Sequence, residues 1–369
     1  MQLAKQINRK PLLLVVLYVF LFLLTRLPLL NYDTVNPDAV NWHTRSEQFV
    51  VGLKAGDWLK TYQHYHPGVT LMWIMGPVVE ILKHTSSDLK IYTSANYLFF
   101  DFASKISLVV VQLVLSLVLL FVLSKILSFK KALLVVSLFT FEPFFVGNSR
   151  LLHLDVLMTL FLFNGLAYAF WAGKEFKWWK AALSGAFLAL AFLTKSVAIG
   201  GLVFVLLYVI CKRFPKSLVI ILGTFVLTTF ALFPALWVRP AYVLTEIFSE
   251  GERVGIRKGH EQIVFGDYTT NAGFEFYPLV LLLKVSPVTI IGVLLFVFFA
   301  IRSFSGKNFK RPKEISFELF LAIFSLGYLL VMSFPTKKID RYIIPMFPFL
   351  ALMAVDGYER LKKHKTLIA

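Results

Sequence analysis

Long apolar stretches alternate with short polar segments along almost the whole chain. Each stretch is about 15–25 residues long, the length that an α-helix needs to cross the hydrocarbon core of a bilayer. The stretches lie at approximately 11–30, 97–124, 132–147, 154–172, 181–194, 196–211, 217–237, 278–301, 316–333 and 342–356. The pattern therefore predicts an all-α polytopic membrane protein with about ten transmembrane helices.

Basic residues gather in every second connection between these stretches. The clusters lie at 5–10, 125–131, 174–180, 212–216, 302–313 and 360–365. Because short cytoplasmic loops carry an excess of Lys and Arg, we assign these connections and the N-terminus to the cytoplasm. The first stretch has no small-residue cleavage site behind it, so we expect an uncleaved anchor. The expected location is a prokaryotic plasma (inner) membrane.

This topology leaves two long connections on the non-cytoplasmic side, at about 31–96 and 238–277. In the first, the segment 38–55 has apolar positions at helical spacing and is expected to be an amphipathic helix lying in the membrane interface. The segment 69–82 is apolar but short, and it contains Pro77, which favours a re-entrant or interfacial helix. With no visible repeat or soluble domain, 1–369 is expected to be a single transmembrane domain.

The composition supports this interpretation. Of the 369 residues, 58% are hydrophobic and only 16% are charged, which excludes an ordinary soluble domain. A formal net charge of +17 would suit a nucleic-acid-binding protein, but the basic residues occupy the short loops that membrane topology requires. The single cysteine, Cys211, excludes an intrachain disulfide and a cysteine-based metal site.

Acidic residues stand close to the outer ends of two predicted membrane helices. Asp38 follows the first membrane helix closely, where it either caps a helix or acts as a general base on an incoming hydroxyl. Asp155 begins a later helix, after Glu142 and a short turn. It either caps that helix, with Arg150 as its ion-pair partner, or has a functional role. Its depth in the membrane favours a functional role.

Cationic residues converge on the same side of the membrane. The stretches 181–194 and 196–211 are separated only by Lys195, and because an ammonium group facing hydrocarbon is costly, we expect a polar cavity there. Facing Asp38 across such a cavity, the cations would hold a phosphate group, although each alone is more often a snorkelling side chain. The set comprises Lys195, Arg257, Lys258, His260, Lys337, Lys338 and Arg341.

The sequence gives less support to a metal site or a nucleotide-binding site. His64 and His66 lie on alternate positions and resemble half of a metal site, so a divalent metal is possible but not required. The chain has no glycine-rich phosphate-binding loop, which argues against a nucleotide-driven step.

At these residues the chain resembles the C-type (GT-C) membrane glycosyltransferases, in the glycosyltransferase family 39-like group that includes the lipid A aminoarabinose transferase and the protein O-mannosyltransferases. Ala39 departs from the family pattern where a second acidic residue is usual, and His66 stands where Lys is common. The similar motifs are Pro37-Asp38-Ala39 with Trp42, Gly56-Asp57-Trp58, His66-Pro67, Arg150 to Asp155, Leu193-Thr194-Lys195, Gly259-His260 to Phe265-Gly266, Phe276-Tyr277-Pro278, Leu283 to Pro287, and Lys338 to Tyr342 with Pro345 and Pro348.

The resemblance implies a GT-C-like fold, a polyprenyl-phosphate-sugar donor, and a lipid, glycan or protein acceptor, with no required cofactor and no nucleic acid. It implies an inverting displacement in which Asp38 is the base and Asp155 orients the acceptor or the base. The donor phosphate would be held by His66, Lys195, Arg257, His260, Arg341 and Tyr342. Acceptor binding or support would come from Trp42, Tyr65, Arg150 and Glu142.

Two other functions stay open. Ten helices with intramembrane charges would also serve a flippase or transporter of lipid-linked glycans, although no inverted repeat is visible and the polar residues gather in outer loops. A non-catalytic subunit of an envelope glycan complex is the other alternative, which Ala39 keeps open.

Overall fold

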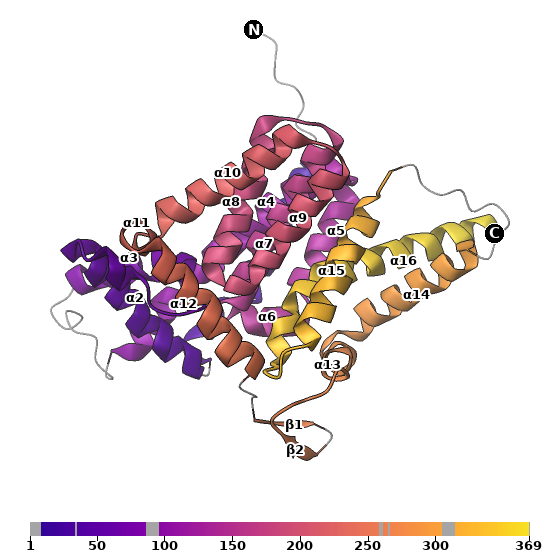
Figure 1. Cartoon of the computed structure of the whole chain (residues 1–369). Coiled ribbons are helices and arrows are strands. Elements are labelled where there is room, and N and C mark those ends of the chain that lie inside the picture. Colours follow the sequence, from indigo (N-terminus) through magenta and orange to yellow (C-terminus); the bar gives the residue numbers. More distant parts are fainter. Residues whose placement is uncertain are drawn as a thin grey trace, which may run out of the picture.

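The computed structural model describes residues 9–33, 35–85, 96–257, 261–264, 266–304 and 314–368, and it is almost entirely helical (Figure 1). The helices are α1 (Arg9–Leu24), α2 (Pro37–Ala55), α3 (Val69–Thr85), α4 (Tyr97–Ile126), α5 (Phe129–Thr140), α6 (Pro143–Ser149), α7 (Asp155–Lys174), α8 (Trp178–Thr194), α9 (Ile199–Cys211), α10 (Pro215–Leu232), α11 (Ala235–Val238), α12 (Pro240–Glu252), α13 (Phe276–Lys284), α14 (Pro287–Phe304), α15 (Phe317–Ser333) and α16 (Phe347–Ile368). Short helical turns are η1 (Leu30–Tyr32), η2 (Trp58–Thr61), η4 (Ser196–Ala198), η5 (Arg253–Arg257) and η6 (Asp340–Met346). Strands β1 (Gln262–Val264) and β2 (Asp267–Thr269) pair antiparallel, with Ile263 opposite Tyr268.

Helix α7 forms the centre of the bundle. Almost all of its side chains are buried, as expected for a helix that is apolar on every side. It packs against α4 and α8. Asn164 Nδ2 donates a hydrogen bond of 3.1 Å to the carbonyl of Leu115 in α4, and Ser184 Oγ of α8 donates one of 2.9 Å to the carbonyl of Gly165. These bonds give polar donors a partner inside an apolar core.

The all-helical, polytopic membrane architecture that the apolar stretches predict is confirmed. Among the described residues, α4, α7 and α10 are each long and apolar enough to cross a membrane. Two helix pairs pass this test only when the two helices are taken together, and both pairs are bent, α5 and α6 by 68° and α13 and α14 by 116°. Four further apolar helices, α1, α8, α9 (with η4) and α15, are shorter. The stretches 132–147 and 278–301 are therefore two helices each rather than one.

Both bends have the same cause. Each second helix begins at a proline, Pro143 after Glu142 and Pro287 after Ser286. Proline has no N–H to continue the preceding helix, while its fixed φ suits the first turn of a new one. Glu142 accepts a hydrogen bond of 2.5 Å from the Ser286 N–H and bonds of 2.8 Å from the hydroxyls of Ser286 and Thr289. Glu142, at the bend between α5 and α6, thus stabilises the start of α14.

Helix α2 is the amphipathic helix that the first outer connection predicts. Asn36 caps it, because the Asn36 side chain accepts a hydrogen bond of 2.6 Å from the N–H of Ala39, and Pro37 occupies the first turn. Gly56 ends it in the left-handed conformation, with φ of 68°. Of the two alternatives for Asp38, the capping role is therefore wrong.

The two ends of the bundle differ in chemistry. At one end α4, α7 and α9 finish and α5, α8, α10 and α15 begin, and the basic clusters at 125–131, 174–180 and 212–216 lie there. We call it the basic end. The other end carries α2, α3, α6, α12 and η6, with the β1–β2 hairpin at the bottom of Figure 1.

Candidate functional site

A cavity of 410 Å³ opens at the end of the bundle opposite the basic end. Its walls come from α2, the loop before α3, the turn that leads into α7, the junction between α8 and η4, and the segment that enters η6. We call it the polar pocket. It is lined by Pro37, Asp38, Asn41, Trp42, Arg45, His64, Tyr65, His66, His153, Leu154, Asp155, Lys195, Lys337, Ile339, Arg341 and Tyr342.

Asp155 carries a buried carboxylate between two cations. Lys195 Nζ donates a hydrogen bond of 2.6 Å to Asp155 Oδ1. Arg341 Nε lies 3.1 Å from Asp155 Oδ2, as an ion pair without hydrogen-bond geometry. Because a charge is costly to bury without a partner, the two cations account for a carboxylate that is only 3% exposed inside the bundle. Asp155 is also the first residue of α7, where the helix dipole favours a negative charge.

The same arginine joins Asp38 to this cluster. Arg341 Nη2 donates a hydrogen bond to Asp38 Oδ2, so one guanidinium bridges two carboxylates from segments far apart in the sequence. The Asp38 side chain is 41% exposed, so this carboxylate faces the open part of the polar pocket. Burial lowers the pKa of Arg341, but the carboxylates of Asp155 and Asp38 outweigh it and raise that pKa above its usual value. The guanidinium therefore stays charged.

Three histidines of the polar pocket are neutral. His153 Nδ1 accepts the N–H of Asp155 at 3.1 Å and Nε2 lies 3.1 Å from Asn148 Oδ1, which assigns the proton to Nε2. His64 Nδ1 accepts the N–H of His66 at 3.1 Å. Burial is the main cause that lowers the pKa of His64 and of His153 to about 4, and that lowers the pKa of His66 well below its usual value. At neutral pH they contribute hydrogen bonds but no charge.

Cationic side chains outnumber carboxylates around the polar pocket. Arg45 Cζ lies 4.7 Å from the centre of the Trp42 ring, and Lys195 Nζ lies 3.7 Å from the centre of the Tyr342 ring. Aromatic faces hold cations in place without using up their N–H donors. The excess suits an anionic group such as a phosphate. The cations are Arg45, Lys195, Lys337 and Arg341, and the carboxylates are Asp38 and Asp155.

The structure brings most of the predicted site residues into one pocket, although their roles stay predictions. Those that line it are Asp38, Trp42, Tyr65, His66, Asp155, Lys195, Arg341 and Tyr342. The side chain of Arg257 and the whole of His260 lie outside the described residues. Lys338 is buried and has a structural role, because its Nζ donates hydrogen bonds to the carbonyls of Ala272 at 2.7 Å and Pro335 at 2.9 Å.

Arg150 and Glu142 lie outside the polar pocket. Arg150 makes a two-pronged ion pair with Asp33, at 2.7 and 2.9 Å, and also donates to the carbonyls of Arg26 and Pro28. The partners of Asp155 are therefore the lysine and arginine described above, and the predicted pair between Arg150 and Asp155 is wrong. Glu142 is occupied at the start of α14, where it accepts three hydrogen bonds.

Sequence reasoning gave no site role to several residues that line the pocket. Arg45 follows Asp38 by seven residues, two turns of the same helix, so both lie on one face of α2. That spacing was the available signal. The place of His153 in the pocket depends on the hydrogen bond that it accepts from the N–H of Asp155, the first residue of α7, and no sequence pattern predicts that bond.

The sequence allows a divalent metal. Within the described ranges, no group of three or more His, Cys, Asp or Glu side chains is placed to hold one. His64 and His66 do lie in the same pocket. However, His64 Nδ1 accepts a backbone N–H, and His66 Nδ1 lies 3.3 Å from the hydroxyl of Ser196. One nitrogen of each ring therefore takes part in holding the loop before α3.

Comparisons with known proteins place the fold. No family model and no curated protein sequence matches the chain. Among solved structures, ArnT from Cupriavidus metallidurans bound to undecaprenyl phosphate superimposes with a TM-score of 0.65 at 14% sequence identity, over 97% of this chain and 61% of that one. The oligosaccharyltransferase AglB from Archaeoglobus fulgidus, in complex with an inhibitory peptide and a dolichol-phosphate, superimposes with a TM-score of 0.53 at 11% identity, over 97% of this chain and 51% of that one.

The chain therefore has the GT-C fold that its motifs predict. It spans about 61% of the length of ArnT and about half that of AglB. A structure of an Archaeoglobus fulgidus oligosaccharyltransferase tethered with an acceptor peptide gives a TM-score of 0.58 at 11% identity, over 98% of this chain and 51% of that one. At these identities the similarity concerns the arrangement of the helices.

Proposed function

We propose that this chain is a membrane glycosyltransferase that moves a sugar from a polyprenyl-phosphate carrier to an acceptor hydroxyl or amine on the non-cytoplasmic face. The observation that carries the proposal is the polar pocket, where a partly exposed carboxylate stands beside a buried cluster of cations. The fold supports it, because ArnT and AglB, whose structures hold undecaprenyl phosphate and dolichol-phosphate, share this helical arrangement.

The cations of the polar pocket would bind the donor phosphate and stabilise it as it leaves. Arg341 presents a planar fork that matches two phosphate oxygens, and Lys195 and Lys337 add point charges. Because Lys195 and Arg341 are positioned by Asp155, they need little rearrangement when negative charge develops on the phosphate. Asp155 in this proposal is a positioning residue.

Asp38 would act as the general base. It is not used as a helix cap, and its carboxylate is the more exposed of the two in the pocket. In the proposed step Asp38 takes the proton of the acceptor hydroxyl while the acceptor oxygen forms a bond to the anomeric carbon. The bond from that carbon to the phosphate oxygen breaks on the opposite face, and the polyprenyl phosphate leaves with the electron pair. The configuration of the sugar is inverted.

The substitution Asp38→Asn tests this assignment. Removing a general base costs about 10²–10⁴-fold in rate, so Asp38→Asn is expected to lose that much transfer while keeping its fold. The assay follows a radiolabelled sugar from a purified polyprenyl-phosphate donor in detergent, without ion gradients. Asp57→Asn, an exposed carboxylate in the same outer connection, is the matched control.

Near-normal transfer by a folded Asp38→Asn protein would remove the base assignment. Transfer by the natural chain without a gradient also separates an enzyme from a flippase or transporter, because movement across a membrane forms no new glycosidic bond. If no product forms with any lipid, glycan or protein acceptor, the glycosyltransferase proposal is wrong as a whole.

A further inference from the structure

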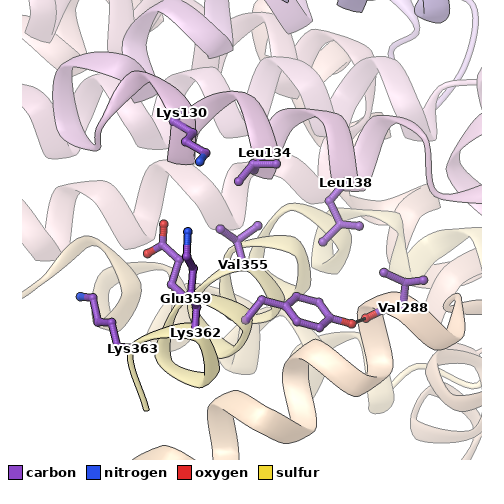
Figure 2. Close-up of a pocket in the computed structure, with 9 residues that line it drawn as sticks. Lys130, Leu134, Leu138, Val288, Val355, Glu359, Lys362 and Lys363 are labelled. Atoms are coloured by element: carbon purple, nitrogen blue, oxygen red, sulfur yellow. Dashed lines mark hydrogen bonds between the residues drawn. The ribbon is translucent and has the colours of Figure 1, made fainter. Parts of the chain in front are cut away.

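A second and larger cavity of 1030 Å³ lies near the basic end, between α5, α14 and α16 (Figure 2). We call it the lysine groove. It shares no lining residue with the polar pocket. It is lined by Lys130, Leu134, Leu138, Val288, Val355, Tyr358, Glu359, Lys362 and Lys363.

The lysine groove has an apolar part and a cationic part. Lys130, Leu134 and Leu138 are spaced by four residues, so they lie along one face of α5 over about 12 Å. In Figure 2 the lysines stand at one end of the groove, whereas Leu138 and Val288 lie at the other. Charge and apolar surface are therefore separated along its length.

Helices α14 and α16 form the wall opposite α5. They pack without room for side chains at Gly292 and Gly357, since a Cβ on Gly357 would lie 2.0 Å from the Gly292 carbonyl oxygen. The Tyr358 hydroxyl donates a hydrogen bond of 2.7 Å to the carbonyl of Val288 in α14. Because its polar atom is used in this way, Tyr358 offers mainly its ring to the groove. Both contacts join α16 to α14 and hold this wall together.

The side chains that line the groove include more basic than acidic groups. The neighbouring Lys131 is paired, because its ammonium contacts Asp356 and lies 3.2 Å from Glu318, and neither carboxylate lines the groove. The groove itself has three lysines against one carboxylate, Glu359. Lys130 and Lys363 are exposed. An occupant of matching chemistry has a negative head and an apolar tail.

We propose that the lysine groove binds an anionic phospholipid, with an acyl chain along Leu134, Leu138 and Val355 and the phosphate among the lysines. A free phosphate would leave the apolar wall uncovered. A second copy docked face to face would bring lysines against lysines, which is unfavourable. The proposed topology places this groove in the cytoplasmic leaflet, where anionic lipids concentrate. The proposal concerns a site apart from catalysis and does not depend on the proposed function.

The test uses two photoactivatable phospholipids with the same diazirine-bearing acyl chain, one a phosphatidylglycerol and the other a phosphatidylcholine. The full chain is reconstituted into symmetric vesicles containing either probe, and cross-linked peptides are mapped by mass spectrometry. Each lysine near an anionic headgroup favours binding severalfold, so phosphatidylglycerol is expected to label α5 and α16 at the groove about tenfold more than phosphatidylcholine.

Two kinds of variant define the site. The double variant Lys130→Gln with Lys363→Gln is expected to reduce the preference for phosphatidylglycerol at the groove at least threefold, leaving phosphatidylcholine labelling unchanged. Its matched control is Lys212→Gln with Lys216→Gln, in another connection of the basic end, which should leave the preference intact. Leu134→Trp fills the apolar part and is expected to reduce labelling by both lipids.

Equal labelling of the groove by the two lipids overturns the proposal, and so does an equal loss of preference in the control pair. Protection of the groove from both probes, together with a dimer in analytical ultracentrifugation, assigns it to a second copy instead. All variants are checked for folding by size-exclusion chromatography and circular dichroism. Lys130, Lys363 and Lys216 are exposed and Lys212 is partly exposed, so folding is expected to be preserved.

Discussion

At the scale of single residues, the chemistry of the polar pocket depends on which charged side chains form ion pairs with one another. Arg341 contacts both Asp38 and Asp155, and Lys195 contacts Asp155. The presence of charged residues near predicted helix ends could be read from the sequence. Which of them pair could not, because Arg150 and Arg341 are equally plausible partners for Asp155 until the chain is folded.

Part of the role of Asp38 follows from a local signal in the sequence. Asn36 precedes Pro37, and proline prefers the first turn of a helix, so the residue before it is the natural cap. The sequence alone therefore indicates that Asp38 is not needed as the cap of this helix. Its contact with Arg341 joins segments some 300 residues apart, which local patterns do not encode.

His153 predicts a pH dependence of stability. Burial lowers its pKa to about 4 in the folded chain, whereas the unfolded chain binds the proton with an ordinary pKa near 6.5. Between these values the unfolded state holds more protons, so stability falls as the pH falls from about 6.5 to about 4. His153→Gln is expected to remove up to about 3 kcal/mol of that acid loss, seen as a smaller drop in Tm between pH 7 and pH 4. The exposed His84→Gln should leave the drop unchanged, and identical pH profiles for His153→Gln and the natural chain would contradict the prediction.

At the scale of helices and loops, hydrophobic runs predict the existence of elements better than their breaks. The runs at 132–147 and 278–301 are apolar throughout, so hydropathy alone reads each as one helix. The prolines at 143 and 287 mark the bends, but a proline inside an apolar run is also compatible with a kinked helix. What decides is the cap that Glu142 gives to α14, a long-range contact.

The loop before α3 offers a matched pair of glycines. Gly68 has φ of 61° and a Cβ there would lie 2.1 Å from the Trp42 ring, whereas Gly56 has φ of 68° and no atom within 4 Å of its Cβ position. Alanine costs about 1 kcal/mol of backbone strain at either position. Only Gly68→Ala also displaces Trp42, which lines the polar pocket and lies under Arg45. We expect about 10–100-fold less transfer for Gly68→Ala than for Gly56→Ala, measured at equal folded fractions. Equal rates would show that Trp42 is not needed in this position.

At the scale of the whole molecule, the sequence predicted the GT-C fold from a series of short motifs taken in order. The fold is confirmed. The clustering of Asp38, Asp155, Lys195 and Arg341 follows from that fold rather than from any spacing. The lysine groove does not follow from the sequence, because lysines in short loops also carry the signal for membrane topology.

The orientation of the molecule can be tested with single cysteines. In a Cys211→Ser background, Asp57→Cys marks the end with the polar pocket and Glu175→Cys marks the basic end, and both positions are exposed. The positive-inside rule predicts that a membrane-impermeant maleimide labels Asp57→Cys on intact cells and labels Glu175→Cys only after the membrane is opened. The reverse pattern would invert the topology and place the proposed reaction in the cytoplasm.

The excess of cations in the polar pocket has a consequence for turnover. A polyprenyl-phosphate sugar is a diester with one negative charge, whereas the polyprenyl phosphate left after transfer is a monoester that approaches a dianion at neutral pH. In the proposed reaction, four cations against two carboxylates would attract the spent carrier more strongly than the loaded one. In inhibition assays polyprenyl phosphate is therefore expected to bind at least as tightly as the donor. The binding of an uncharged polyprenol ester, whether equal or weaker, does not bear on that comparison. Under the proposed function, release of the spent carrier is therefore expected to be slow.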